Sequence, residues 1–310
     1  MIRRLLAFIP SLLVVAVFIG LLIDFVPGDP VAMIIGMEAP QAAINQRRAE
    51  LGLDRPVQVR LAEWLINAAK GDFGSSYFLT KPVSVVVAER YRVTLSLTVF
   101  SLIVGCVVGI PTGIIASIKQ GQLADWAVTT MALIWLSLPA FLVALGFIYL
   151  FAVHLRWFPV GSYVPFSEDP VEYLRHLVLP GVALGLGFSG VVSRFTRTSM
   201  LEVLRMDYVR TAEAKGLARL SVLTRHALRN ALIPIITVIG IGTGDLLGGA
   251  VITESVFTMP GVGRMILEAV KRRDYPVIQA GVLAVAATYL VINLLVDLLY
   301  TWVDPRIRYE

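Results

Sequence analysis

The sequence has few charged residues and a single cysteine, and both scarcities limit what the protein can be. Of its 310 residues, 16% are charged and 57% are hydrophobic, whereas soluble domains carry about 25% charged and about 45–50% apolar residues. Cys106 alone cannot form an intrachain disulfide or a cysteine metal cluster, and we interpret it as a small apolar residue within a helix. The composition argues against an ordinary soluble domain.

Catalytic and metal-binding patterns are also missing. The three histidines, His154, His176 and His226, lie far apart without ligand spacing, so we expect no metal site. Neither H-E-x-x-H nor G-x-S-x-G occurs, and no catalytic residue is predicted. No lysine follows a glycine, so a Walker A loop is excluded. The net charge of +5 is dispersed over many loops, which does not favour a nucleic-acid partner.

Long uncharged runs are present instead, and a bilayer requires them whereas a soluble core does not. A helix needs about 20 apolar residues to cross a membrane. Six stretches meet or nearly meet this length: 5–26, 94–118, 126–153, 177–192, 231–252 and 280–303. The first run is too long for the core of a signal peptide, so we expect it to be retained. The sequence therefore predicts an all-α integral membrane protein with six transmembrane helices in a lipid bilayer.

Charge favours one orientation of these spans. An even number of spans puts both termini on one side, which then holds 13 Lys and Arg against 14 on the other side. Eight of those 14 lie in the long segment 27–93, and long segments can cross a membrane regardless of charge. The remaining loops give 13 against six. Because basic loops stay inside, both termini are predicted to be cytoplasmic.

The segment 27–93 is expected to be a helical insertion on the extracytoplasmic side. Within it, 41–51 has a helical pattern, and a second helix opens near Pro56 and ends at Gly71. One apolar stripe runs along this second helix: Val57, Leu61, Trp64, Leu65 and Ala68. Asp274 is placed to cap the last span. The chain thus divides into three parts: 1–26, a first transmembrane helix; 27–93, the insertion; and 94–310, a five-helix core.

A basic segment, 194–230, interrupts the apolar runs between the fourth and fifth spans. It carries eight Lys or Arg and three acids, so its net charge equals that of the whole chain. Four residues before its glycine follow helical spacing: Leu201, Leu204, Tyr208 and Ala212. Gly216 can adopt the positive φ that ends a helix, and an apolar stripe restarts beyond it. The pattern predicts two helices joined at Gly216, a protruding elbow suited to a groove on a partner.

Across nearly its whole length the sequence resembles the permease subunits of dipeptide, oligopeptide and nickel ABC importers, a branch that also carries glutathione and opine-like compounds. Nine motifs occur in order: VPGDP, LGLDRPV followed by GDFGSSY, SLPAF, RTAEAKGL, RHALRNALIP, LLGGAVITESVF, MPGVGR, RDYPVIQA and DPRIRY. Each motif is weak alone, but nine at suitable spacing are specific.

The resemblance implies a permease subunit of an ATP-driven, binding-protein-dependent importer of peptides or related small solutes in a bacterial or archaeal cytoplasmic membrane. The implied partners are a second homologous permease, two ATPase subunits and an extracytoplasmic substrate-binding protein. ATP and Mg²⁺ would bind to the ATPase subunits, and no cofactor is expected in this chain. A secondary transporter or channel is a rival, but it would usually show several intramembrane charges or an internal repeat. An integral-membrane enzyme is a further rival without a catalytic constellation.

In that family the loop between the fourth and fifth spans forms a coupling helix that seats in a groove of an ATPase subunit. Carried onto this chain, the coupling residues are Tyr208, Thr211, Ala212, Glu213, Gly216 and Leu217. We expect the backbone turn at Gly216 and the 208–217 surface to make the contact, not one ion pair. The insertion and the segment 254–278 are expected to form the outer surface that meets the binding protein.

Asp245 stands alone near the middle of the fifth predicted span. A carboxylate there costs about 2.5–3.5 kcal/mol unless it meets water or a partner. One interpretation is a hydrogen bond to Thr243 or to a neighbouring helix. Another is that Asp245 faces the water-filled pathway and meets a cationic group on the cargo, such as a peptide amino terminus. A third is that it lies nearer the membrane interface. The flanking glycines favour the pathway, because they leave room beside the carboxylate.

Overall fold

The computed structural model describes residues 2–24, 28–36, 38–79 and 81–303. No β-strand is found in these ranges, and the chain folds into helices. The C-terminal DPRIRY motif and the first two residues of VPGDP lie outside the described residues. Two compact units divide the chain: Met1–Thr94 with Pro260–Leu290, and Leu95–Met259 with Val291–Glu310.

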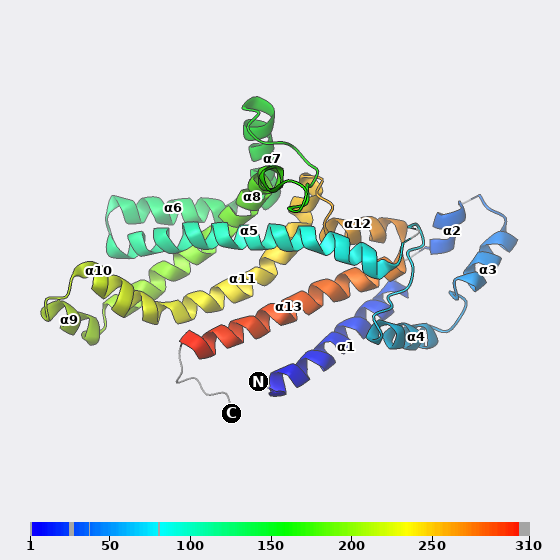
Figure 1. Ribbon diagram of the computed structural model, residues 1–310, viewed down its shortest axis with the longest axis horizontal. Helices are drawn as coiled ribbons and strands as arrows, with labels where there is room; N and C mark the ends of the chain where they lie inside the picture. The colour runs from blue at the N-terminus through cyan, green and yellow to red at the C-terminus, as the bar shows by residue number, and fades with distance from the viewer. Residues whose placement is uncertain (1, 25–27, 37, 80, 304–310) are drawn as a thin grey trace. The chain divides into compact units, whose positions relative to one another are not determined.

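The first unit contains the N-terminal helices, the start of α5, α12 and the start of α13 (Figure 1). Their bounds are α1 (Ile2–Asp24), α2 (Pro30–Ile35), α3 (Gln41–Glu50), α4 (Val57–Ala69), α5 (Val83–Ile118), α12 (Val262–Arg272) and α13 (Tyr275–Val303). The two helices predicted between residues 41 and 71 are therefore confirmed as α3 and α4. The predicted stripe of α4 is half-buried, and α4 packs against α1, where Leu61 lies close to Gly20.

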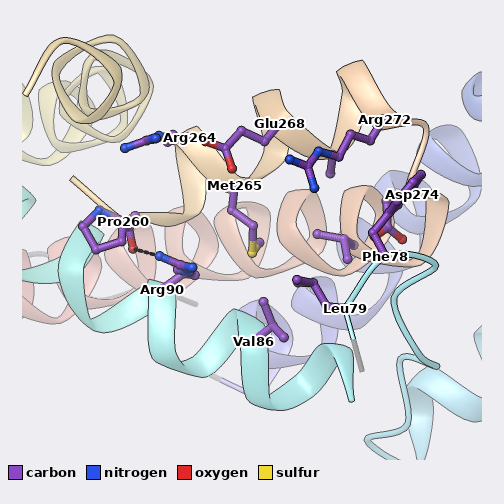
Figure 2. Close-up of a pocket in the computed structure, with 13 residues that line it drawn as sticks. Phe78, Leu79, Val86, Arg90, Pro260, Arg264, Met265, Glu268, Arg272 and Asp274 are labelled. Atoms are coloured by element: carbon purple, nitrogen blue, oxygen red, sulfur yellow. Dashed lines mark hydrogen bonds and ion pairs between the residues drawn. The ribbon is translucent and has the colours of Figure 1, made fainter. Parts of the chain in front are cut away.

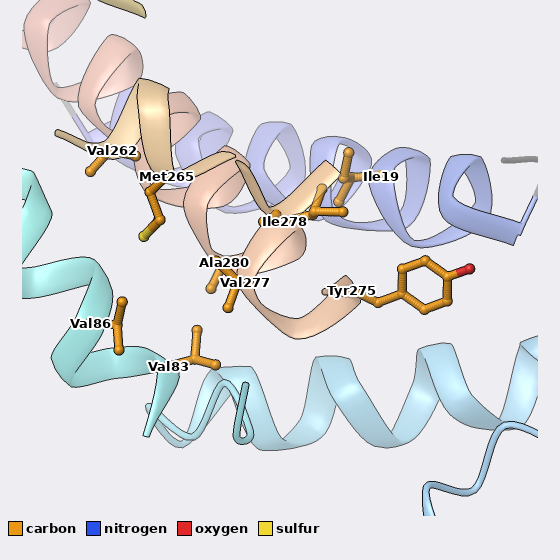
Figure 3. Close-up of a cluster of buried hydrophobic side chains, with 10 residues drawn as sticks. Ile19, Val83, Val86, Val262, Met265, Tyr275, Val277, Ile278 and Ala280 are labelled. Carbon is orange, nitrogen blue, oxygen red and sulfur yellow. The ribbon is translucent and has the colours of Figure 1, made fainter. Parts of the chain in front are cut away.

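Buried apolar side chains from α1, α5, α12 and α13 form the core of the first unit (Figure 3). Ile19, Val86, Met265 and Ile278 represent the four helices in this core. Two polar contacts hold α5 in place. The hydroxyls of Tyr91 and Thr288 share a hydrogen bond, and the Val262 N–H donates to Thr94 Oγ1 at 2.8 Å.

Asp274 caps α13, as its position before Tyr275 predicts. Its carboxylate accepts the N–H of Val277 in the first turn of the helix. It also accepts the Ser76 hydroxyl and, at 3.1 Å, the N–H of Tyr77. One buried carboxylate therefore fixes the start of α13 to the segment that leads into α5.

The second unit contains most of α5 and the helices between it and Met259. Their bounds are α6 (Leu123–Ser137), α7 (Ala140–Phe147), the π-helix η1 (Ile148–His154), α8 (Pro170–Leu204), α9 (Asp207–Ala214), α10 (Arg219–Ser221), the π-helix η2 (Val222–Leu228) and α11 (Arg229–Val256). Glycines let α5 approach α8 closely. A Cβ added at Gly109 would lie 2.7 Å from Val192 Cβ, and one at Gly113 would lie 2.6 Å from Thr196 Cβ.

The all-α membrane fold is confirmed, but the count of six spans is not. Among the described residues, four helices are long and apolar enough to cross a membrane: Val83–Ile118, Pro170–Leu204, Arg219–Val256 and Tyr275–Leu299. The apolar part of α1, Phe8–Leu22, is shorter than a full span.

The predicted third span, 126–153, is not one straight helix. Instead α6 and the helix Ala140–His154 meet at Pro139 with a bend of 99° (Figure 1). Proline disfavours the helical conformation in the residue before it, and Leu138 indeed has an extended ψ of 123°.

The predicted fourth span, 177–192, lies within a helix of 35 residues that extends beyond it at both ends. The helix begins where Asp169 accepts the N–H of Val171 at 2.8 Å and Pro170 occupies the first position. It continues past polar residues to Leu204, since loss of hydrophobicity does not by itself end a helix.

Candidate coupling elbow and pathway face

The predicted turn forms at Gly216, which has a φ of +76°. Its N–H donates to the Glu213 carbonyl at 2.9 Å, and the Leu217 N–H donates to the Ala212 carbonyl at 3.4 Å. These two bonds make a Schellman motif at the end of α9. A Cβ at Gly216 would meet no atom within 4 Å. Glycine is therefore needed for the backbone angle and not for space.

A small apolar core makes the elbow a rigid part of its surroundings. Val209 and Ala212 on α9 are buried against Val222 of η2, with Val203 and Leu204 of α8 beside them. Of the predicted coupling residues, Ala212 thus lies inside this core. Because the core joins α8, α9 and η2, a displacement of α9 must also displace the helices on either side of it.

Tyr208 holds α9 to the beginning of α11. The Asn230 side-chain amide donates to the Tyr208 hydroxyl at 2.7 Å and to the His226 carbonyl at 3.1 Å. Tyr208 is itself exposed, so the same side chain both braces the elbow and is available at its surface.

The rest of the predicted set is exposed: Thr211, Glu213, Gly216 and Leu217. The structure adds Met206 and Leu220, whose exposed fractions are 51% and 72%. Sequence reasoning passed over these two as contact residues, although Leu220 belongs to the predicted apolar stripe. Exposed apolar side chains in a basic surrounding suit a groove on a partner protein.

Beyond Gly216 the chain runs as one helical path from Arg219 to Val256. Within it, η2 has the π-helical hydrogen-bond pattern, which accommodates one additional residue per turn. π-Bulges occur frequently at functional sites. The apolar stripe predicts a helix here but carries no signal for its hydrogen-bond register.

The second unit contains an ion pair that sequence reasoning missed, between a buried carboxylate and a half-buried guanidinium. Asp125 on α6 accepts two hydrogen bonds from Arg197 on α8, at 2.6 Å from Nε and 2.8 Å from Nη2. Asp125 also accepts the N–H of Gly121 at 3.0 Å. This bidentate pair ties the α5–α6 turn to the last third of α8, the helix that leads into the elbow.

Asp245 lies on α11 beside the contact with α8. Gly242 and Gly249, three residues before it and four after it, make that contact, because a Cβ at either would come within 3 Å of an α8 side chain. Asp245 is exposed together with Ile241, Gly248 and Ile252, which follow helical spacing on one stripe.

The hydrogen bond considered between Asp245 and Thr243 is not formed. The Thr243 hydroxyl is buried and donates to the Ile239 carbonyl at 2.6 Å. No hydrogen bond or ion pair of Asp245 is found among the residues that the structure describes. The open face of α11 therefore presents a carboxylate that the described part of the chain leaves unpaired.

Comparison with known families gives two matches that together cover most of the chain. Residues 109–309 match the family described as binding-protein-dependent transport system inner membrane component. Residues 1–98 match the N-terminal part described for the membrane component of such systems.

Similar proteins cover the full length. A probable peptide ABC transporter permease of Sinorhizobium fredii is 42% identical over 99% of this chain and 98% of its own. A dipeptide transport system permease of Alkalihalophilus pseudofirmus is 41% identical over 99% and 98%. A glutathione transport system permease of Shigella flexneri is 40% identical over 100% and 98%.

Among solved structures, the fold is similar to an inward-facing MetNI methionine ABC transporter. The TM-score is 0.60 at 18% identity, over 73% of this chain and 100% of that one. An amino acid ABC transporter gives a TM-score of 0.50 at 17% identity, over 72% of this chain and 94% of that one.

Proposed function

Because the chain belongs to the family of binding-protein-dependent transport system inner membrane components, we propose that it forms part of the pathway by which such an importer takes up peptides or related small solutes. The chain is a multi-pass inner-membrane permease subunit of an ABC importer, a translocation component and not an enzyme. The observation that supports a peptide-like cargo is the 40–42% identity over the full length to permeases named for peptide, dipeptide and glutathione transport.

The importer contains this chain, a second homologous permease, two ATPase subunits and an extracytoplasmic substrate-binding protein. ATP and Mg²⁺ bind to the ATPase subunits, and this chain carries no cofactor. The exposed carboxylate of Asp245 supports the presence of a second permease beside α11. A charge on the open face of a transmembrane helix requires a partner or a water-filled cavity.

The elbow couples the ATPase subunits to the pathway. Its exposed surface at Thr211, Glu213 and Leu217 seats in an ATPase groove, while Ala212 holds the elbow to its neighbours. Closure of the ATPase pair displaces α9, and the shared core passes this displacement to α8 and η2. Such rigid-body movement exchanges two discrete states of the bundle, as in other alternating-access systems.

Both termini lie in the cytoplasm, with the elbow, and the insertion faces outside. Charge supports this orientation, since the elbow segment has a net charge of +5 and basic loops stay inside. The outer surface formed by the insertion and the segment 254–278 meets the binding protein. Asp245 faces the pathway and interacts with a cationic group on the cargo.

The test is reconstitution of the whole complex in nanodiscs and in proteoliposomes. ATPase activity is measured with empty and with loaded binding protein, and uptake of a labelled dipeptide and of glutathione is measured in parallel. We expect loaded binding protein to stimulate ATP hydrolysis and uptake to require ATP. Uptake driven by an ion gradient without ATP would identify a secondary transporter instead.

A further inference from the structure

A pocket of about 190 Å³ opens in the first unit between the start of α5 and α12 (Figure 2). Val86 on α5, Met265 on α12 and Val277 on α13 are buried and give it an apolar wall. Phe78 and Leu79 line one end. The coupling mechanism above makes no use of this pocket.

Three arginines line the same pocket. Arg264, Glu268 and Arg272 follow one another at intervals of four residues along α12, so they share one face of that helix (Figure 2). Arg90 approaches from α5 on the other side (Figure 2). Arg90 lies by Pro260, just before α12 begins, and Arg272 lies by Phe78 where α12 ends, so the two arginines line opposite ends of this apolar-walled space (Figure 2).

The two acids that line the pocket are already engaged. Glu268 accepts a hydrogen bond from Arg264 Nε at 2.8 Å. Asp274 has an exposed fraction of 4% and accepts hydrogen bonds from Ser76 and Tyr77. Burial raises the pKa of Asp274 above its usual value. Neither carboxylate is left to neutralise the remaining arginines.

Arg90 and Arg272 have no ion pair among the described residues. Arg90 Nη1 reaches only the Pro260 carbonyl, at 3.5 Å, and the Arg272 guanidinium lies 5.9 Å from the centroid of the Phe78 ring. Arg90 is half-buried. A partly desolvated guanidinium without a carboxylate is a strong site for an incoming anion.

We propose that this pocket receives acidic side chains of the extracytoplasmic substrate-binding protein, whose carboxylates pair with Arg90 at one end and with Arg272 at the other. The inference rests on the proposed orientation, which puts the pocket outside. A guanidinium fork matches a carboxylate, and the apolar wall accommodates the methylene groups of a glutamate. Small-molecule sites enclose about 300–1,000 Å³, so the pocket suits protein side chains better than a peptide cargo.

The experiment measures the affinity of the loaded cognate binding protein for the full complex in nanodiscs. Arg272→Gln and Arg90→Gln should each weaken binding at least about ten-fold, because removing one partner of a desolvated charge pair is costly. Arg175→Gln is the control, since Arg175 lies on the same predicted side, loses the same charge and does not line the pocket. It should bind as the wild type does. Added salt should weaken the wild type more than Arg272→Gln.

Substitution of surface acids of the binding protein then identifies the partner. One Glu→Gln or Asp→Asn variant should bind the wild-type complex weakly and show no further loss with Arg272→Gln, as a double-mutant cycle requires. Equal affinity of the wild-type and both arginine variants overturns the proposal. Normal docking with altered uptake of anionic cargo also overturns it, and assigns the arginines to the pathway. If the wild-type complex itself neither binds nor responds to the loaded protein, the proposed function fails instead. Arg272 is exposed, so its variant tests the proposal even if Arg90→Gln does not assemble.

Discussion

At Gly216 a side chain would strain the backbone without clashing, because φ is +76° and the space around it is open. Gly121 has the same setting between α5 and α6, with a φ of +76° and open space. A non-glycine residue in this conformation costs about 1–3 kcal/mol. The two glycines therefore offer equal strain at two different surfaces.

Gly216→Val should reduce the stimulation of ATP hydrolysis by loaded binding protein about five-fold or more, which corresponds to a coupling free energy of at least about 1 kcal/mol. The mis-aimed turn moves the elbow relative to its groove, while insertion into the membrane persists. Gly121→Val carries the same strain and should retain stimulation. An equal response of the two variants in nanodiscs would show that the strain, and not the elbow surface, is responsible.

Asp245→Asn removes the charge from the open face of α11 and keeps the shape. If the carboxylate meets a cationic group on the cargo, import of positively charged peptides should fall about ten-fold, which is the range for a hydrogen bond to a charged group. Neutral peptides should be imported at nearly the wild-type rate, and Asp245→Glu should preserve the preference. Identical uptake of both peptide classes by wild type and Asp245→Asn would reject a charge-selecting role.

At the scale of helices, nearby residues were sufficient to predict some elements but not others. Helices α3, α4 and α9 were predictable because their periodicity, prolines and terminal glycines are contained within a few residues. The break at Pro139 was not, because the sequence marks the proline but not whether a helix bends or stops there. The π-helix η2 depends on hydrogen-bond register, for which the apolar stripe has no signal.

The Asp125–Arg197 pair was missed because its members are 72 residues apart in the sequence. The available signals were an acid at the start of an apolar run and an arginine within the extension of another. Taken alone, each residue is interpreted as an ordinary charge at the membrane interface. Only the packing of α6 against α8 brings them together.

Asp125→Asn should lower stability by about 1–3 kcal/mol, since it leaves the half-buried guanidinium of Arg197 without its charged acceptor. The midpoint of thermal unfolding in detergent reports this loss. Arg197→Gln should give a similar loss, and the double variant should lose less than the sum of the two. Strict additivity in that cycle would mean that the two side chains do not act as a pair.

For the whole molecule, the charge bias of the short loops is the evidence for orientation. On a Cys106→Ser background, a cysteine at Ile66 in α4 should react with a membrane-impermeant reagent in intact cells. A cysteine at Leu220 in the elbow should react only after the membrane is opened. Both positions are well exposed, at 57% and 72%, so lack of access to the protein surface does not explain a difference. Labelling of Leu220→Cys in intact cells would show that the elbow faces outside and that the predicted orientation is wrong.

The central claim is that the elbow of this chain seats in an ATPase subunit, and cross-linking tests it most directly. Leu217→Cys on the Cys106→Ser background is treated with a short cysteine-to-amine cross-linker in the assembled complex. Val85→Cys serves as the control, because Val85 and Leu217 have the same exposed fraction, 43%, and lie on opposite predicted sides. The account predicts an adduct between Leu217→Cys and an ATPase subunit and none from Val85→Cys. An intact complex in which Leu217→Cys gives no ATPase adduct, or Val85→Cys gives one, would contradict it.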